Sequence, residues 1–529
     1  MTKNARAVLL VLVLVGLAVV PATQASTSAT RPSVQTPADE ADRQGGTLNL
    51  FSTQTIGRID PLTTQANYLT VLAYNTFGQL VHYEAGTWIV VPDLAESWDV
   101  SDDGLTYTFR MRPDLTFHDG SPIALSDVVF SLERVGSDIS VLRDQVIGIE
   151  SITADDAANS VSITLAEPDL FLLSKLAGIG GSVIVPEAAI TEYGDQFATT
   201  PETTIGSGPF RLIEKNETQL VWERFPEFYQ PAYVNQIVMR IIPDTRTQQL
   251  EFDAGNVDWI GSIQDVAQAE RFRNDPQFAN YYKEFLAPAK NRFAVNHSME
   301  PFDDIRVRQA ISMAIDGALM AEIGGLSAVS YTLLHPEMPG AEEGAPLYPM
   351  DVAAAQQLLA EAGYPDGFST EFYIYDNARY IAQAEVMQQQ LAAIGVTINI
   401  NTSEFGTYMS EVVNQNYPFY FALANVIYPD PAAYLYNSFH SDGPFNSGYA
   451  NPEVDELLTQ AIAENDDLDQ RVQLTLQAED LILEDAAVIY IWDRTAAHVF
   501  QPWIHGVEEV VPIYPRVRFN TVWIEASRR

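Results

Sequence analysis

Side chains that could do chemistry are plentiful in this chain, but their spacing assembles no catalytic motif. Seven histidines occur, and no two of them stand three or four residues apart, so the paired histidines that hold zinc on one helix face are missing. Neither the GxSxG motif of a nucleophile elbow nor the GxxxxGKS or GxxxxGKT phosphate loop is present. We therefore predict that the protein is not an enzyme and holds no metal or cofactor.

One short segment mimics a metal site and is better explained as a turn. The run from Asp99 to Gly104 resembles the first half of a calcium loop, but Arg110 stands at the twelfth position, where calcium needs a glutamate. Asp103 and Gly104 are instead typical of a hairpin turn. With 70 acidic residues in the chain, no carboxylate pair stands out as the acid and base of a glycosidase. A secreted hydrolase acting on a glycan or peptide stays open as the alternative function.

The N-terminal residues have the pattern of an export signal. Lys3 and Arg6 precede an apolar run, and small residues then lead to a cleavage position after Ala25. The run is shorter than the roughly 20 residues of a membrane-spanning helix, so we favour a signal peptide over residues 1–25 rather than an anchor. The small, polar residues 26–45 are typical of a flexible leader.

The chain contains no cysteine, which bears on its compartment and its anchoring. An exported protein without cysteine forms no disulfide and depends on its packed core for stability. It also lacks the residue to which the lipid of a lipoprotein would be attached. We therefore expect an exported protein, periplasmic or extracellular, that is not a lipoprotein.

Acidic residues outnumber basic ones by 70 to 29, which gives a formal net charge of −41 at pH 7. A protein that binds nucleic acid needs a basic face, so this balance excludes nucleic acid as a partner. Anionic membrane surfaces are disfavoured for the same reason. Two explanations of the acidity are open: adaptation to high salt, which screens self-repulsion, or the simple solubility of a secreted protein.

The residues from Pro92 to Arg134 have the pattern of a strand, a turn and a helix. Apolar and polar residues alternate over 105–112, as in a half-buried strand, and Ser126 is placed to cap the helix that follows. The whole run is PDLAESWDVSDDGLTYTFRMRPDLTFHDGSPIALSDVVFSLER. It closely resembles a signature of the family 5 extracellular solute-binding proteins, which serve peptide and related ABC importers.

Two further segments resemble the same family. PFDDIRVRQAISMAID, at 301–316, has the spacing of an amphipathic helix that Asp303 or Asp304 can cap, and GSGPF, at 206–210, is a turn that leads into a strand. Helices alternate with strands through the C-terminal half, which argues for α/β units. The resemblance implies an α/β fold of the periplasmic-binding-protein type, class II, with two main lobes, a hinge and an extra inserted domain.

The resemblance also implies domains of broken connectivity. Domain I would comprise 46–85, 206–285 and 496–529, domain II would be the insertion 86–205, and domain III, the ligand lobe, would span 286–495. Such a protein, which we expect to be a monomer, captures a small solute between domains I and III. It delivers this solute, a peptide, an oligosaccharide or a similar molecule, to a membrane ABC permease. Signalling to a receptor without transport is a third hypothesis.

In this family, a segment ending in DYxxP lines the pocket, and its Asp commonly takes the α-amino group of a bound peptide. Here Tyr428 and Pro431 match, but Ile427 occupies the Asp position. An isoleucine cannot neutralise an ammonium group, whose burial without a partner is costly. Either the cargo is not an ordinary peptide with free termini, or another carboxylate takes over. The candidate carboxylates are Asp430, Glu404 and Glu411.

The other pocket candidates are aromatic and amide side chains, which suit sugars or other neutral solutes. With Ile427, the candidate ligand-binding residues are Phe405, Tyr408, Asn425, Tyr428 and Trp492. Each aromatic residue could instead belong to the core. Peptide binders of the family also often carry an arginine shortly before the helix expected at 381–394, where it takes the ligand carboxylate. Residues 373–375 stand at that place here, with Arg379 nearby.

Overall fold

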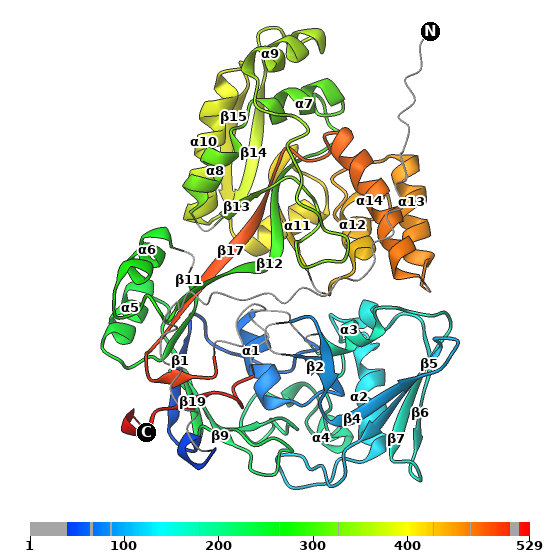
Figure 1. Ribbon diagram of the computed structural model, residues 1–529, viewed down its shortest axis with the longest axis vertical. Helices are drawn as coiled ribbons and strands as arrows, with labels where there is room; N and C mark the ends of the chain where they lie inside the picture. Colours follow the sequence, from blue (N-terminus) through cyan, green and yellow to red (C-terminus); the bar gives the residue numbers. More distant parts are fainter. Residues whose placement is uncertain are drawn as a thin grey trace, which may run out of the picture.

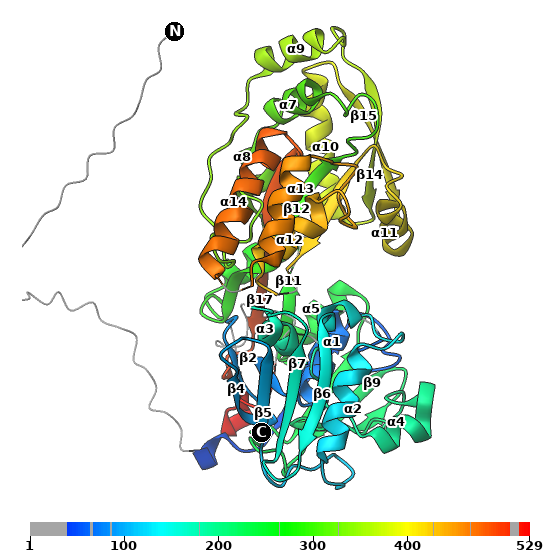
Figure 2. The ribbon, with the colours of Figure 1, turned by 90° about the vertical axis from the view of Figure 1, so that its right-hand side faces the viewer.

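The computed structural model describes residues 40–528 apart from 64–66, 85–86, 179, 264, 326, 427, 466 and 508–517. It has two lobes, joined by the long strands β12 (Tyr282–Val295) and β17 (Tyr490–Phe500) (Figures 1 and 2). The lower lobe of Figure 1 holds the elements before β12 together with β18 and β19, and the upper lobe holds those between β12 and β17. The predicted signal peptide, 1–25, lies outside the described residues, as does the predicted leader up to residue 39.

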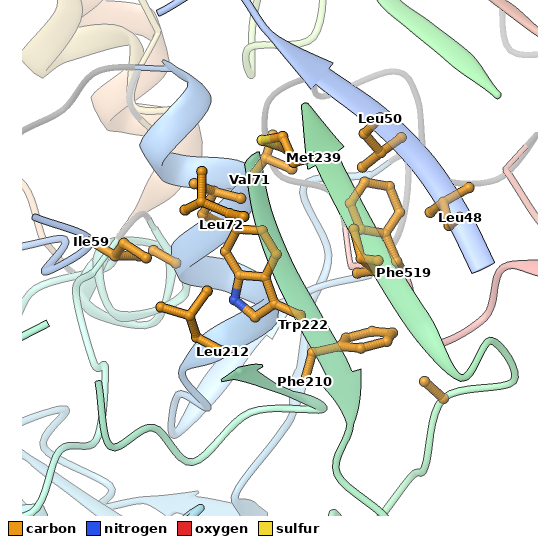
Figure 3. Packing of buried hydrophobic residues seen from close by; sticks show 14 of the residues in the cluster. Leu48, Leu50, Ile59, Val71, Leu72, Phe210, Leu212, Trp222, Met239 and Phe519 are labelled. Atoms are coloured by element: carbon orange, nitrogen blue, oxygen red, sulfur yellow. The ribbon is translucent and has the colours of Figure 1, made fainter. Parts of the chain in front are cut away.

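One part of the lower lobe is built on a four-stranded sheet in the order β1–β10–β9–β8. The strands are β1 (Thr47–Ser52), β8 (Phe210–Lys215), β9 (Gln219–Arg224) and β10 (Gln236–Ile241). Strand β1 runs parallel to β10, so segments that are far apart in the chain share this sheet. Trp222 is buried at its centre, near Leu72 of helix α1 (Asn67–Thr76), and donates a hydrogen bond of 3.1 Å to Thr76 (Figure 3).

A second four-stranded sheet, in the order β4–β5–β7–β6, forms the other part of the lower lobe. Its elements are β4 (Ala95–Val100), β5 (Thr106–Met111), helix α2 (Leu125–Val135), β6 (Ile149–Asp155) and β7 (Ser160–Leu165). The predicted strand and the hairpin turn at Gly104, whose φ is +70°, are confirmed. The predicted cap Ser126 is wrong. Helix α2 starts at Leu125, and the N–H of the preceding Ala124 donates to Asp127 at 3.0 Å, so Ser126 lies inside the first turn.

The remaining elements of the lower lobe are short. The strands are β2 (Val81–Tyr83), β3 (Val90–Pro92), β11 (Trp259–Ile263), β18 (Ile504–His505) and β19 (Trp523–Ile524). The α-helices are α3 (Leu172–Ala177), α4 (Glu187–Tyr193), α5 (Thr245–Asp253) and α6 (Val266–Asn274). Single 3-10 turns occur at Glu40–Arg43, Arg143–Val146, Gly194–Gln196 and Ala526–Arg528.

The upper lobe is built on a mixed sheet flanked by helices (Figure 1). Its own strands are β13 (Ser327–Ser330), β14 (Ser369–Tyr375), β15 (Thr397–Ser403) and β16 (Phe419–Asn425). Its first helices are α7 (Ile305–Met313), α8 (Gly317–Gly324), α9 (Val352–Glu361) and α10 (Ala378–Ala392). The others are α11 (Phe405–Val413), α12 (Pro431–Phe439), α13 (Pro452–Ala463) and α14 (Leu468–Glu484). Of the two predicted caps of α7, Asp303 and Asp304, the structure has Asp304, which accepts a hydrogen bond of 2.8 Å from the Arg306 N–H.

One sheet passes from the lower lobe to the upper lobe, in the order β11–β17–β12–β16–β14–β15, with β13 added on β17. The pairing of β12 with β17 shifts register between Leu286 and Lys290, where the strands cross from one lobe to the other. The predicted α/β architecture with two main lobes is confirmed, whereas the domain boundaries at 85, 205, 285 and 495 stay a prediction.

Among the described residues, no helix combines the length and the apolar character needed to cross a bilayer.

Candidate solute-binding site

A cavity of about 270 Å³ lies in the upper lobe between β16 and the helices α11 and α12. Strand β16 forms one wall, because side chains from Tyr420 to Asn425 line the cavity. The start of helix α11 closes one side, and residues of α12 close another. Helix α12 begins with a proline after the capping residue Asp430, an arrangement that the chain's Asp430-Pro431 order favours. The cavity therefore lies within the upper lobe, along the segment that holds most of the predicted ligand-binding residues, and a solute site between domains I and III stays a prediction.

Four of the predicted ligand-binding residues line this one cavity. Phe405 is 47% exposed at the start of α11, and Asn425 is exposed at the end of β16. Tyr428 follows β16 and is half-buried. Tyr408 is only 1% exposed, and its hydroxyl donates to the carbonyl oxygen of Phe421, so it forms the floor of the cavity more than a free contact surface. The fifth residue of this segment, Ile427, lies outside the described residues.

Trp492 differs from expectation, because it lies in the core and not on the cavity wall. Its side chain is fully buried, and its ring lies among those of Phe293 at 5.1 Å, Phe421 at 5.7 Å and Tyr490 at 4.9 Å. Alternate residues of a strand point to opposite faces of the sheet. Trp492 and Tyr490 both belong to the cluster on one face, while Ile491 between them packs on the other. The indole thus stabilises the sheet from the face it shares with helix α10.

Asp430, the carboxylate nearest to the predicted ammonium site, already has partners. Its two oxygens pair with the guanidinium of Arg471 at 3.2 and 2.6 Å, and it accepts hydrogen bonds from the N–H groups of Ala432 and Ala433. Both side chains of the ion pair are almost fully buried. Three of these four bonds go to Oδ1 and one goes to Oδ2, so both oxygens of the carboxylate have partners. Asp430 therefore caps α12 and joins it to α14, and its charge is balanced within the protein.

The two other candidate carboxylates do not line the cavity. Glu404 is exposed and caps α11, accepting hydrogen bonds from the N–H groups of Gly406 and Thr407 at 2.9 and 3.2 Å. These bonds hold the pKa of Glu404 below its usual range. Glu411 accepts a bond of 2.6 Å from Asn416. The described residues thus provide no unpaired carboxylate in the cavity wall for a ligand ammonium group.

Arg292 is one of the cavity residues that were not among the predicted ligand-binding residues. It stands near the C-terminal end of β12, is 5% exposed, and lines the cavity together with Tyr434 of α12. Its guanidinium carbon lies 4.9 Å from the ring centre of Phe439. Burial raises the pKa of Tyr434 above its usual range, and the nearby positive charge of Arg292 opposes this shift. The signal in the sequence was an arginine directly before the apolar strand residues Phe293–Val295.

The two lobes meet beside the cavity. The ring of Tyr428 lies 6.2 Å from that of Phe171 in the lower lobe, and the ammonium nitrogen of Lys175 lies 5.5 Å from the centre of the Tyr428 ring. The indole N–H of Trp88, also in the lower lobe, donates a bond of 2.7 Å to Glu337 of the upper lobe. One residue of the cavity wall, Tyr428, therefore also takes part in the contact between the lobes.

The strands that connect the lobes carry a buried ion pair. Lys290 of β12 lies 3.1 Å from Asp493 of β17, directly after the register shift. Its ammonium group also donates to the carbonyl oxygen of Thr332 at 2.8 Å. Burial lowers the pKa of Lys290, and the carboxylate of Asp493 opposes that shift. These contacts tie the two connecting strands together on the upper side of the crossing.

The expected alternative site for a ligand carboxylate is occupied by internal contacts. Tyr373 and Tyr375 lie in β14, and Arg379 lies in the first turn of α10. The guanidinium of Arg379 donates to the carbonyl oxygen of Gly324 at 2.7 Å and to Ser327 at 2.9 Å. Arg379 thus joins α10 to the end of α8 and the start of β13.

Known protein families and solved structures share the sequence pattern and the fold of this chain. A profile described as bacterial extracellular solute-binding proteins, family 5 Middle, matches residues 90–446, which is more than half of the chain. The chain belongs to this family. It is a solute-binding protein of an ABC importer, and its α/β fold with two lobes is the fold of that class. The family is a class of proteins that bind solutes for transport.

Curated relatives of this family 5 protein differ in what their names say they bind. It is 28% identical to heme-binding protein A of Haemophilus influenzae over 541 residues, which cover 94% of each chain. It is also 28% identical to the glutathione-binding protein GsiB of Escherichia coli O1:K1 / APEC over 413 residues, 74% of this chain and 78% of the relative.

Solved structures share the fold of the family 5 protein along nearly its whole length. The substrate-binding protein CtaP of Listeria monocytogenes superposes with a TM-score of 0.80 at 20% identity, covering 91% of this chain and all of the other. DppA of Helicobacter pylori, in complex with the peptide STSA, gives a TM-score of 0.77 at 24% identity, covering 92% and 99%.

Proposed function

We propose that the protein captures a small organic solute against the cavity of the upper lobe and delivers it, unchanged, to a membrane ABC permease. The main support for this proposal is the position of Tyr428. Its ring lines the cavity and also contacts Phe171 and Lys175 of the lower lobe. A solute that packs on Tyr428 affects the contact between the lobes directly. Occupancy of the cavity and closure of the two lobes are therefore coupled.

The proposed motion is a hinge closure about β12 and β17. Long connecting strands that change direction at a few residues are typical hinges, and the register shift between Leu286 and Lys290 marks such a place. A ligand can shift the balance between open and closed forms only by its different affinity for the two. Contacts that exist only when both lobes surround the solute would supply that difference.

The cargo class is proposed from the wall and from the relatives. Aromatic rings and amide groups, such as those of Phe405 and Asn425, suit peptides and oligosaccharides alike. The relatives' names mention heme and glutathione, and solved neighbours hold a peptide or mannopinic acid. A small solute that is a peptide or a similar multifunctional molecule fits this range.

The proposal also covers the oligomeric state of the protein, its export, its partners and its lack of catalysis. We infer a monomer that is exported without a lipid anchor, does not bind nucleic acid, and needs no cofactor. We also infer that it performs no chemistry on its ligand, in contrast to the alternative of a secreted hydrolase. Delivery to a permease is favoured over receptor signalling because the solved neighbours include a protein described as associated with an ABC transporter.

Titration calorimetry against panels of short peptides, oligosaccharides and sugar acids tests this function. We expect saturable binding of at least one class, with a decrease in the radius of gyration by small-angle X-ray scattering as the lobes close. Mass spectrometry after prolonged incubation should recover the ligand intact. Absence of binding in every class, without any closure, would remove the basis of the proposal, and turnover of a bound ligand would favour the hydrolase.

A further inference from the structure

The buried arginine of the cavity lacks the partners that other buried arginines have. Four arginines of the described residues are buried: Arg134, Arg292, Arg308 and Arg471. Arg134 pairs with Asp60, and Arg471 pairs with Asp430. Arg308 donates to the carbonyl oxygens of Asp485 and Phe302 at 2.7 and 2.9 Å. The side chain of Arg292, by contrast, forms no hydrogen bond or ion pair with any described residue, and the ring of Phe439 lies beside its guanidinium.

The hydroxyl of Tyr434 also lacks a hydrogen-bond partner among the described residues. It is buried and lines the same cavity as Arg292. A buried charge and a buried hydroxyl are both costly to leave unpaired, and native proteins pair nearly all such groups. Two unpaired donors that line one cavity therefore point to a ligand that accepts hydrogen bonds and carries negative charge.

The carboxylates around this cavity are occupied elsewhere. Asp430 is paired with Arg471, and Asp493 lies beside Lys290. Glu479 accepts hydrogen bonds from the hydroxyl of Thr332 and from backbone N–H groups that follow it. None of these carboxylates lies within ion-pair distance of Arg292 in the described part of the chain. The positive charge of Arg292 is thus available to a bound molecule.

We propose that this cavity is an anion subsite, in which Arg292 binds a carboxylate of the solute and Tyr434 donates a further hydrogen bond. The proposal rests on the solute-binding function above and narrows its cargo to solutes with an acidic group. The planar guanidinium matches a carboxylate with two parallel bonds. A volume of about 270 Å³ suits one acidic arm of a solute better than a whole ligand. Aromatic side chains around the guanidinium exclude water, which strengthens the ion pair.

The carboxylate could come from a peptide terminus, an acidic side chain or a sugar acid, and the same chemistry recognises all three. A first experiment therefore uses a simple probe, glutarate, with the uncharged glutaramide as its matched partner. Thermal melting is recorded at constant ionic strength for the wild type, for Arg292→Gln, and for Arg110→Gln as a control. Arg110 is an exposed arginine on β5, far from the cavity.

We expect glutarate, and not glutaramide, to raise the melting temperature of the wild type and of Arg110→Gln. Arg292→Gln should not respond, and Tyr434→Phe should respond less than the wild type. A wild type that does not respond to glutarate, or an Arg292→Gln variant that responds as strongly as the wild type, would overturn the proposal.

A second measurement separates a ligand role from a structural role. Replacing a buried charge that lacks a partner by an apolar side chain of similar size is neutral or stabilising. We therefore expect Arg292→Met to melt at the same temperature as the ligand-free wild type or higher. A large decrease, like that expected from breaking a paired arginine, would show that Arg292 holds the fold together and would contradict the anion subsite.

Solutes identified by the binding panel give the final test. For an acidic solute, Arg292→Gln should weaken binding about 10- to 100-fold, because a bond to a charged group is lost, and the neutral amide of the same solute should be unaffected. Equal loss for both forms, or no loss for either, overturns the subsite while the solute-binding function stands. If no solute binds and the lobes never close, the function fails, and the glutarate experiment still decides whether the anion subsite exists.

Discussion

His498 is a buried residue whose surroundings suit an apolar ring better than an imidazole. Both of its ring nitrogens are buried and have no hydrogen-bond partner among the described residues. The rings of Phe285 and Phe500 lie 5.5 and 4.7 Å away. Burial lowers the pKa of His498 to about 3, so the folded protein keeps it uncharged. The unfolded chain protonates it near pH 6.5, and the free energy of unfolding therefore falls as the pH drops below 6.5.

We predict that His498→Phe leaves the free energy of unfolding at pH 7 unchanged or raises it. The variant should also lose less stability than the wild type between pH 7 and pH 4, because one histidine that binds a proton only after unfolding is gone. Urea unfolding at a series of pH values measures both effects. The control is His118→Phe.

His118 is also buried, but its ring nitrogens contact the carbonyl oxygen of Gly208 at 3.0 Å and the N–H of Gly206 at 3.3 Å. Its replacement should cost about 1–3 kcal/mol at pH 7, since buried partners lose their bonds. If His498→Phe destabilises the protein as much as His118→Phe does at pH 7, the imidazole of His498 has a structural partner and the prediction is wrong.

Helix packing in the upper lobe depends on the ion pair between Asp430 and Arg471. Arg471 of α14 bonds to Asp430 at the start of α12 and to the carbonyl oxygens of Ala461 and Ile462 at the end of α13. Three helices therefore meet at one guanidinium. Its aromatic neighbour is Phe171 of the lower lobe, at 5.2 Å, so the same group lies beside the contact between the lobes.

We predict that Arg471→Met destabilises the protein by about 3–5 kcal/mol, because it leaves a buried carboxylate without a counter-charge. Arg211→Met is the matched control, since Arg211 pairs with Glu223 on the surface, where such pairs contribute at most about 1 kcal/mol. Urea unfolding compares the two variants. Equal and small losses would mean that the carboxylate of Asp430 reaches water or another partner once Arg471 is gone.

The contact between the two lobes also involves Trp88. Its indole N–H donates to Glu337, and its ring packs against buried clusters of both lobes. We predict that Trp88→Phe weakens solute binding about 2- to 10-fold, because the closed form loses a hydrogen bond to a charged group. Calorimetry measures the affinity, and scattering measures how far the lobes close.

Trp98→Phe, on β4 of the lower lobe, is the control for loss of an indole in general. It should leave the affinity unchanged. If Trp88→Phe and Trp98→Phe behave alike, the bond between Trp88 and Glu337 does not contribute to closure.

The acidity of the whole molecule predicts its response to salt. With a net charge of −41, the surface repels itself at low ionic strength, and screening removes that repulsion. We expect the melting temperature to rise with sodium chloride and to rise equally with choline chloride, since screening does not depend on the cation. A melting temperature that is independent of salt would favour simple solubility as the explanation of the acidity. A response to sodium alone would indicate bound sodium ions.

Much of the fold could be predicted from the sequence because its determinants are local. Alternation over 105–112 predicts β5, and Asp304 caps α7 since an N-cap needs only a side chain two or three residues before its partner. The family signature from Pro92 to Arg134 predicts the two-lobe architecture. It lies in the lower lobe, however, and contributes no side chain to the cavity. Within this signature, local spacing gave the wrong cap for helix α2. Ser126 was predicted to cap the helix, but the backbone N–H of Ala124 donates to Asp127 instead.

The cavity was predictable only in part. Phe405, Tyr408, Asn425 and Tyr428 come from one stretch of chain around β16, and the structure gathers them as that stretch folds back on itself. Trp492 lies in the core, which the sequence had left open as its alternative place. Alternation shows that neighbouring strand residues face opposite ways, but it does not show which face meets the core. That choice depends on the strands beside β17, which are distant in the sequence.

The amino-acid sequence by itself determined the family, part of the helices and strands, the acidic composition and the absence of a catalytic motif, because each depends on composition or on short spacing. The tertiary structure alone decided which charges are paired. Asp430 meets Arg471, and Asp93 meets Arg518 from the far end of the chain. Only after such distant pairs are formed does Arg292 stand out as a buried charge without one. Ion pairs act through space, so the residue that points to the ligand emerges only when the whole chain has folded.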